Sequence, residues 1–283
     1  MSFRKLVQVD PETLVEARMQ AHYATQPVGA VGFSLCPPRD DDSHMSLTVH
    51  PERNMVLGEP IPAAGGARAG IRLGVLEAVV VDGEEPDVST TIEGLNLDEL
   101  IAWYAARLGE RCDEPVTVTL PSYEMPDHPL AHGSRFEMAH LKAEFQEIDA
   151  WYMNLQQLLA ETCASVEGCE PLRLWPHHFD LATLEVVEAG ATRDDMKSVG
   201  RGVSPGDATV PEPYVYVNVW PIPEPDLFSG RALPIGHWHT EGWSGAVLCA
   251  AELKGMDGTA QQHAIREFLA TASSVFVALH NRD

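Results

Sequence analysis

The sequence has few basic residues and no long apolar run. Its 283 residues include 19 Lys and Arg against 42 Asp and Glu, which gives a formal charge of −23. Nucleic acid and anionic membrane surfaces both need a basic face, so neither is an expected partner. No apolar stretch approaches the ~18–20 residues of a membrane-spanning helix. The first residues lead into a polar segment, without the apolar core of a secretory signal.

Cysteine pairs with metal or redox spacing are also missing. The five cysteines, at positions 36, 112, 163, 169 and 249, include no C-x-x-C pair. An odd and scattered set predicts reduced thiols rather than a disulfide framework. The expected location is therefore the cytoplasm.

Common enzyme signatures are absent as well. The sequence contains no G-x-G-x-x-G, no P-loop and no H-E-x-x-H, which are the usual markers of nucleotide and zinc-protease sites. Residues 202–206 match the pattern G-x-S-x-G, but Pro205 follows the serine. A nucleophile elbow needs the backbone N–H of that residue for its oxyanion hole, and proline has none. The segment predicts a tight turn instead.

The residues that are present predict a globular α+β protein. Hydrophobic residues make up 45% of the chain, which is ordinary for a globular protein of a size that can bury a large core. Apolar spacing and capping residues predict helices from Asp10 to before Pro27 and over 97–109, 134–167 and 259–279. Alternating apolar residues predict strands at 28–35, 71–81, 116–120, 181–186, 214–220 and 243–253.

The chain divides into two halves with a similar order of elements. Residues 1–125 form an N-terminal half, and residues 126–283 form a C-terminal half that contains the long helix 134–167. The two halves could also pack as one domain. Each runs from a helix through a short strand with a histidine to further strands and a capped helix. This order predicts a duplicated α-β-α module, with mixed or antiparallel sheets covered by helices.

Histidines and carboxylates two residues apart form the first candidate site. His178 and Asp180 would share one face of an extended chain, and so would His237, His239 and Glu241. His178, Asp180, His237 and His239 together could bind zinc or another divalent first-row metal. Such an ion could activate water for hydrolysis. Alternatively, these histidines bond to backbone carbonyls beside packed tryptophans.

A second set of candidates lies on the strand 214–220. Tyr214 and Tyr216 share a face with Asn218 and Trp220, as the wall of a pocket would require. The same alternation also fits a strand packed under a helix. Asp207, which follows the proline–glycine turn, could contact a ligand or stabilise the turn.

Three functions are compatible with these residues. The first is binding of a small polar molecule in a pocket lined by His, Trp and Tyr, and this is the leading hypothesis. The second is a metal-dependent hydrolase or related enzyme, and the third is a structural or interaction protein without a site. Whether the protein is an enzyme is left open. A homo-oligomer is possible, because no pattern in the sequence distinguishes an interface from a core.

Several strings in the last third resemble an uncharacterised family of bacterial proteins. They are W-P-H-H-F-D-L-A at 175–182, S-P-G-D at 204–207, P-Y-V-Y-V at 213–217 and G-H-W-H-T at 236–240. P-P-R-D-D-D-S-H at 37–44 looks like the N-terminal part of that family, and the similarity covers most of the chain. The last third is also distantly similar to a second bacterial family of unknown function. Neither resemblance implies an activity or a catalytic residue.

Overall fold

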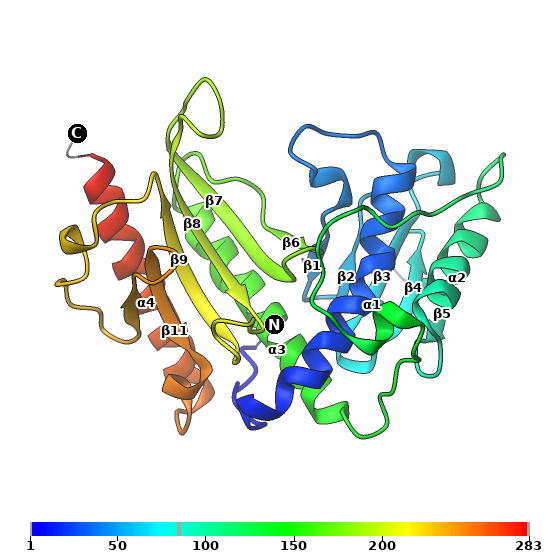
Figure 1. Ribbon diagram of the computed structural model, residues 1–283, viewed down its shortest axis with the longest axis horizontal. Helices are drawn as coiled ribbons and strands as arrows, with labels where there is room; N and C mark the ends of the chain where they lie inside the picture. Colours follow the sequence, from blue (N-terminus) through cyan, green and yellow to red (C-terminus); the bar gives the residue numbers. More distant parts are fainter. Residues whose placement is uncertain (1, 84–85, 282–283) are drawn as a thin grey trace. The chain divides into compact units, whose positions relative to one another are not determined.

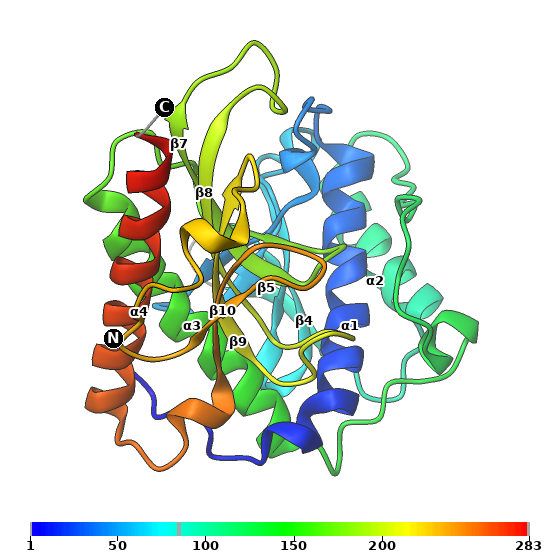
Figure 2. The same cartoon turned by 60° about the vertical axis from the view of Figure 1, so that its left-hand side comes forward.

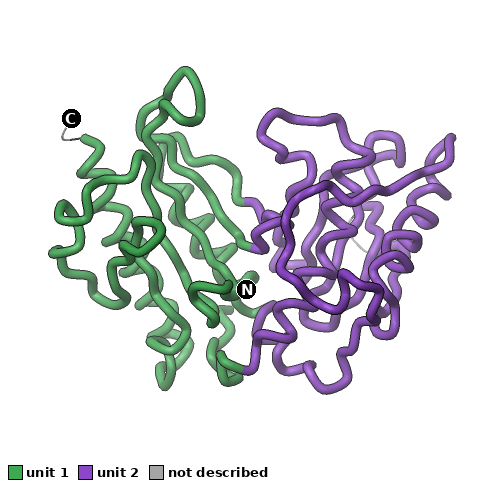
Figure 3. The backbone as a smooth tube through the Cα atoms, viewed as in Figure 1, with its two compact units in different colours: residues 1–12, 150–172, 180–283 green, residues 13–149, 173–179 purple. Residues whose placement is uncertain are grey.

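The computed structural model describes residues 2–83 and 86–281 (Figures 1 and 2). The chain forms two compact units (Figure 3): unit 1 contains residues 1–12, 150–172 and 180–283, and unit 2 contains residues 13–149 and 173–179. These units do not follow the predicted division at residue 125. The reason is that helix α3 (Lys142–Ala164) contributes to both units, and the short segment 173–179 returns to unit 2.

The predicted α+β class is confirmed, because helices accompany two antiparallel sheets. In unit 2 the sheet is a meander in which the strands lie in chain order. These strands are β1 (Thr48–His50), β2 (Met55–Leu57), β3 (Arg68–Arg72), β4 (Glu77–Val81) and β5 (Pro86–Thr91). Helices α1 (Leu14–Leu35) and α2 (Leu97–Gly109) pack against this sheet (Figure 1).

The helix over 97–109 has the predicted bounds and cap. The Asn96 side chain accepts a hydrogen bond from the Glu99 backbone N–H, and the Glu99 carboxylate accepts one from the Asn96 N–H. Both groups would otherwise be unpaired in the first turn, so the local sequence alone sets this helix start.

The first helix continues through Pro27, where the sequence predicted an end followed by a strand at 28–35. Proline in a helix interior costs about 3 kcal/mol, since it removes one hydrogen bond and crowds the preceding turn. In α1 most residues on both sides of Pro27 are buried, including the whole stretch 20–32. Packing around the entire helix outweighs the local cost of the proline.

Two further elements differ from the sequence-based expectation. Residues 71–81 are the end of β3 and all of β4, separated by a 3-10 turn that ends at Leu76 with a positive φ of 41°. Helix α3 begins at Lys142 and not at the Ser134–Glu137 capping box. The reason is tertiary: the backbone of Phe136 bonds to Gly94 and Leu95, which draws residues 134–138 away from a helix.

The sheet of unit 1 contains the candidate site residues of the last third of the sequence. Those of its strands that belong to unit 1 lie in the order β10-β11-β9-β8-β7, and every neighbouring pair among them is antiparallel. The sixth strand of the order, β6 (Arg173–Trp175), belongs to unit 2. The unit 1 strands are β7 (Asp180–Glu188), β8 (Lys197–Ser204), β9 (Tyr214–Trp220), β10 (His237–His239) and β11 (Gly245–Cys249). Helix α4 (Gly258–His280) packs against β8, β9 and β11 (Figure 2).

The cysteines do not all remain free thiols, in contrast to the prediction. Cys163, at the end of α3, forms a disulfide with Cys169, and their Cα atoms are 5.5 Å apart. Cys36, Cys112 and Cys249 are free. The pairing is local, with a sequence separation of 6, so it closes a small loop in unit 1 and forms no framework.

Each unit has a helix before its antiparallel strands and a helix after them, although only the unit 2 sheet is a meander and in unit 1 β11 lies between β9 and β10. This shared order agrees with the duplication that the sequence predicts, which stays a prediction. Among the described residues, no helix is both long enough and apolar enough to cross a membrane.

Candidate functional site

The two faces of the unit 1 sheet have different chemistry. Val215, Val217 and Val219 of β9 are buried on the face against which α4 packs. Tyr214 and Tyr216 alternate with them and therefore lie on the opposite face. The register places Gly202 of β8 directly opposite Tyr216, so both belong to that second face.

We call this second face the aromatic face. Its members share one side of the sheet or of the loop beside it, and they come from β7, β8, β9, β10, β11 and the turn before β11. They are Asp180, Ala182, Gly200, Gly202, Tyr214, Tyr216, Asn218, His237, His239, Trp243, Gly245, Val247 and Cys249. Tyr214, Tyr216 and Val247 form a buried hydrophobic cluster on this face. Six of the members were candidate site residues in the sequence, and the sheet register brings them to one surface.

Glycines allow two rings of the aromatic face to approach the sheet backbone closely. A Cβ atom on Gly202 would be 2.5 Å from both Cζ and Oη of Tyr216, so the Tyr216 ring crosses β8 at this point. It thereby reaches β7, where its hydroxyl donates a hydrogen bond to Oδ2 of Asp180. In the same way, a Cβ atom on Gly245 would be 2.2 Å from the Trp243 ring.

Tyr214 is fixed by a second carboxylate. Its hydroxyl donates to Oδ2 of Asp207 at 2.5 Å. The other oxygen of Asp207 accepts from the backbone N–H groups of Thr209 (2.6 Å) and Val210 (2.8 Å). Asp207 therefore stabilises the loop after β8 and orients Tyr214 at the same time. Both roles that the sequence allowed for Asp207 are compatible with this geometry.

Both tyrosines remain protonated at neutral pH. Burial raises the pKa of Tyr214, and the adjacent Asp207 carboxylate raises it further. Burial likewise raises the pKa of Tyr216 well above its ordinary value, with a further contribution from Asp180. A phenolate beside a carboxylate would be strongly disfavoured, so the two hydroxyls act as hydrogen-bond donors to the two aspartates.

His237 and His239 share the aromatic face, as their spacing predicted, but each has a local contact. The Nε2–H of His239 donates to the backbone oxygen of Glu241 at 2.7 Å, and its ring is centred 4.5 Å from that of Trp243. Nδ1 of His237 lies 3.9 Å from the Glu252 carboxylate. Glu241 thus takes part through its backbone oxygen, and its side chain is exposed.

The predicted metal ligands do not form one cluster within unit 1. Asp180 begins β7, whereas His237 and His239 are on β10, four strands away in the strand order. With neighbouring strands about 4.8 Å apart, four strand spacings separate them by roughly 19 Å. Among the described residues, no group of three or more His, Cys, Asp and Glu side chains is arranged to hold a metal ion.

His178 lies in unit 2, whereas Asp180 lies in unit 1. The expectation that they share one face of an extended chain is wrong, because residues 176–179 form a turn and Phe179 has a positive φ of 55°. The His178 side chain is exposed, and its ring centre is 4.1 Å from that of His177.

The same turn is held within unit 2 by polar groups of α1. The backbone oxygen of Pro176 accepts from Nε2 of His22 at 2.7 Å and from Nε2 of Gln26 at 2.8 Å. The Phe179 ring is stacked on His22, with ring centres 5.0 Å apart. Two residues of the W-P-H-H-F string, Pro176 and Phe179, therefore attach the segment 173–179 to α1.

Sequence reasoning placed Asn218 on the wall of a possible pocket but did not identify the glycines or Trp243 as parts of a site. A signal was nevertheless present: glycines at 200 and 202 alternate along a strand opposite Asn218 and Tyr216. Glycine weakens a strand interior, so its repetition on one face marks a place where another group approaches the backbone closely.

No family model, curated protein or solved structure matches this chain. The resemblance of its strings to an uncharacterised bacterial family therefore stays a prediction. The functional conclusion rests on the geometry of the aromatic face.

Proposed function

We propose that unit 1 binds a small polar molecule on the aromatic face. The observation that carries this proposal is the close approach of the Tyr216 and Trp243 rings to Gly202 and Gly245, with the two rings edge to face and their centres 6.4 Å apart. A protein that needed only a core would gain more by filling Gly202 and Gly245 with side chains. In unit 1 the rings of Tyr216 and Trp243, which carry polar groups at their edges, occupy the space above the two glycines.

The groups on this face define the class of molecule. Trp243 supplies an aromatic surface for stacking, and the exposed Asn218 amide supplies one hydrogen-bond donor pair and one acceptor. The tyrosine hydroxyls already donate to aspartates, and Oδ1 of Asp180 is buried, so the ligand gains its specificity from Asn218. A molecule with one flat face and with hydroxyl or amino groups at its rim fits these partners.

The proposal is tested by ligand-observed NMR with a panel of monosaccharides, nucleosides, amino acids and small amines. We expect at least one class to bind the protein and to lose binding in Trp243→Leu and in Asn218→Ala. Trp103→Leu, in unit 2, is the matched control and should retain binding. Failure of every class to bind, or unchanged binding in Trp243→Leu, contradicts the proposal.

The metal-dependent enzyme remains a separate hypothesis with its own test. Metal analysis of the purified protein, and of the variant with His237→Ala and His239→Ala, decides it. A stoichiometric metal that is lost in the variant would favour the enzyme. Absence of a stoichiometric metal, together with ligand binding, would favour the small-molecule proposal.

A further inference from the structure

The segment Val116–Leu120 has the sequence of a β-strand but no partner strand. Valine, threonine and leucine alternate in it, and Pro115 and Pro121 bound it on both sides. The side chains at 116, 118 and 120 are half-buried and those at 117 and 119 are exposed, as in an extended chain beside a surface. The sequence predicted a strand here, whereas the structure pairs it with none.

One edge of this segment is occupied and the other is free. The Thr119 N–H donates to Oγ of Ser34 on α1 at 2.9 Å, and the Ser34 hydroxyl donates back to the Thr119 oxygen at 3.3 Å. In an extended chain the backbone groups of successive residues point to opposite edges. The groups of Val116, Val118 and Leu120 therefore point away from Ser34, and they have no hydrogen-bonding partner among the described residues.

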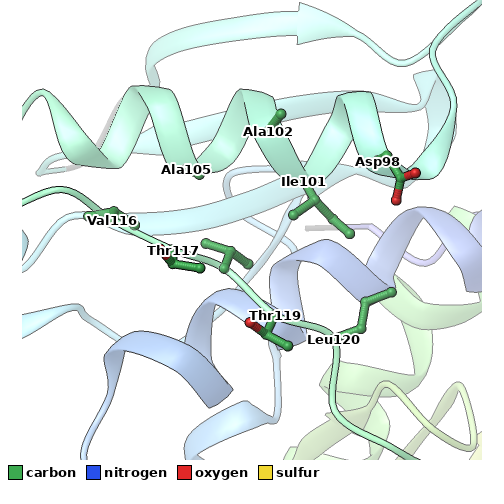
Figure 4. Close-up of a pocket in the computed structure, with 9 residues that line it drawn as sticks. Asp98, Ile101, Ala102, Ala105, Val116, Thr117, Thr119 and Leu120 are labelled. Atoms are coloured by element: carbon green, nitrogen blue, oxygen red, sulfur yellow. The ribbon is translucent and has the colours of Figure 1, made fainter.

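A groove runs along this segment beside α2. It has a volume of about 490 Å³, which is in the range of ligand-binding clefts. Ile101, Ala102 and Ala105 of α2 line one wall and the segment lines the other (Figure 4). The two alanines leave room between helix and segment that a larger side chain would fill.

One acidic residue lines the groove, and two more precede the segment in the chain. Asp98 is the charged residue of its lining and lies at the end where Leu120 is found (Figure 4). At the other end, the exposed Asp113 and Glu114 precede Val116 in the chain. The centre of the groove is apolar, so its charge pattern is acidic, apolar, acidic.

We propose that this groove binds an extended peptide segment of a partner protein, which adds a strand to the free edge of Val116–Leu120. Main-chain hydrogen bonds supply affinity in such β-strand addition, and pockets for alternate side chains supply specificity. The apolar space beside Ala102 and Ala105 fits a Val or Ile at the centre of the peptide. The acidic ends fit Lys or Arg on each side of it.

Charge disfavours a second copy of the chain as the occupant. Antiparallel pairing of two Val116–Leu120 segments would place Asp113 and Glu114 of each copy near Asp98 of the other. Like charges brought together across an interface oppose association, and each copy has a formal charge of −23.

The test uses the full chain and the blocked peptide Lys-Lys-Val-Thr-Val-Lys-Lys with a fluorescent label. We expect binding with a Kd of about 1 mM or below at low ionic strength. The same peptide with N-methylated valines keeps its charge but loses strand donors, so it should bind about 10-fold more weakly. Equal binding of the two peptides would show charge attraction alone and would overturn the proposal.

Two substitutions on α2 test whether the peptide binds in this groove. Ala105→Leu fills the groove and should weaken peptide binding by about 10-fold or more. Ala106→Leu makes the same change at an exposed position of α2 and is the matched control, with wild-type affinity expected. Unchanged binding in Ala105→Leu, no binding at about 1 mM, or a dimer that Ala105→Leu dissociates would each overturn the proposal.

Discussion

At Gly202, the absence of a single methyl group decides where the Tyr216 ring lies. The ring occupies the space that a Cβ atom would take, and from there its hydroxyl reaches Asp180 on the next strand. The aromatic face thus depends on residues without side chains as much as on its rings.

The first residue-scale prediction concerns this glycine. Gly202→Ala should destabilise the protein by about 1–3 kcal/mol, because the new methyl group displaces the buried Tyr216 ring. Urea denaturation measures the loss. Gly230→Ala is the control, since a Cβ atom there has no neighbour within 4 Å, and it should change stability by less than about 0.5 kcal/mol. Equal effects of the two substitutions would contradict the proposed position of Tyr216.

A buried ion pair supports the other face of the same strand. Arg201 is 1% exposed and donates from Nη2 to the Glu185 carboxylate and from Nε to Ser273 Oγ at 2.7 Å. Arg201→Met should cost about 3 kcal/mol or more, because Glu185 would remain a buried charge without its partner. The double variant Arg201→Met with Glu185→Leu should recover part of that loss in a double-mutant cycle. No recovery in the double variant would show that the two residues are not coupled.

At the scale of elements, α1 and the segment 173–179 are joined by a neutral histidine. Burial lowers the pKa of His22 from 6.5 to about 4, and nearby Arg18 and the histidines 177 and 178 also lower it. The hydrogen bond to Pro176 has the opposite, smaller effect. The folded state therefore binds fewer protons than the unfolded chain between these two pH values.

This difference predicts how stability depends on pH. The contribution of neutral His22 is present above pH 6.5 and is lost as the pH falls towards 4. At about 1.4 kcal/mol per pKa unit, the lowered pKa of His22 changes the free energy of unfolding by roughly 3 kcal/mol over this pH range. Urea denaturation between pH 7 and 4 should show a shallower loss of stability in His22→Gln than in the wild type. His263→Gln, on the exposed side of α4, should follow the wild type.

The sequence predicted elements well where local residues set them. The capping box at Asn96 and the alternation over 214–220 gave a helix and a strand with the observed bounds. It failed where tertiary contacts prevail, as in α1 across Pro27 and in the late start of α3. For the candidate site, alternation correctly placed His237, His239, Tyr214 and Tyr216, but the turn at Phe179 and the strand order could not be read from spacing.

At the scale of the whole molecule, the charge of −23 bears differently on the two proposals. Charge is central to the peptide groove of unit 2, where acidic ends select a basic partner. On the aromatic face of unit 1 it is secondary, because aromatic rings and an amide provide the contacts. The two sites lie in different units, so either proposal can fail without the other.

The aromatic face is tested most directly by NMR shift mapping with the best ligand from the screen. The account predicts the largest changes at the backbone amides of Tyr216, Asn218 and Gly245 and at the indole N–H of Trp243. Changes confined to other parts of the chain, or no changes with any class of ligand, would contradict it.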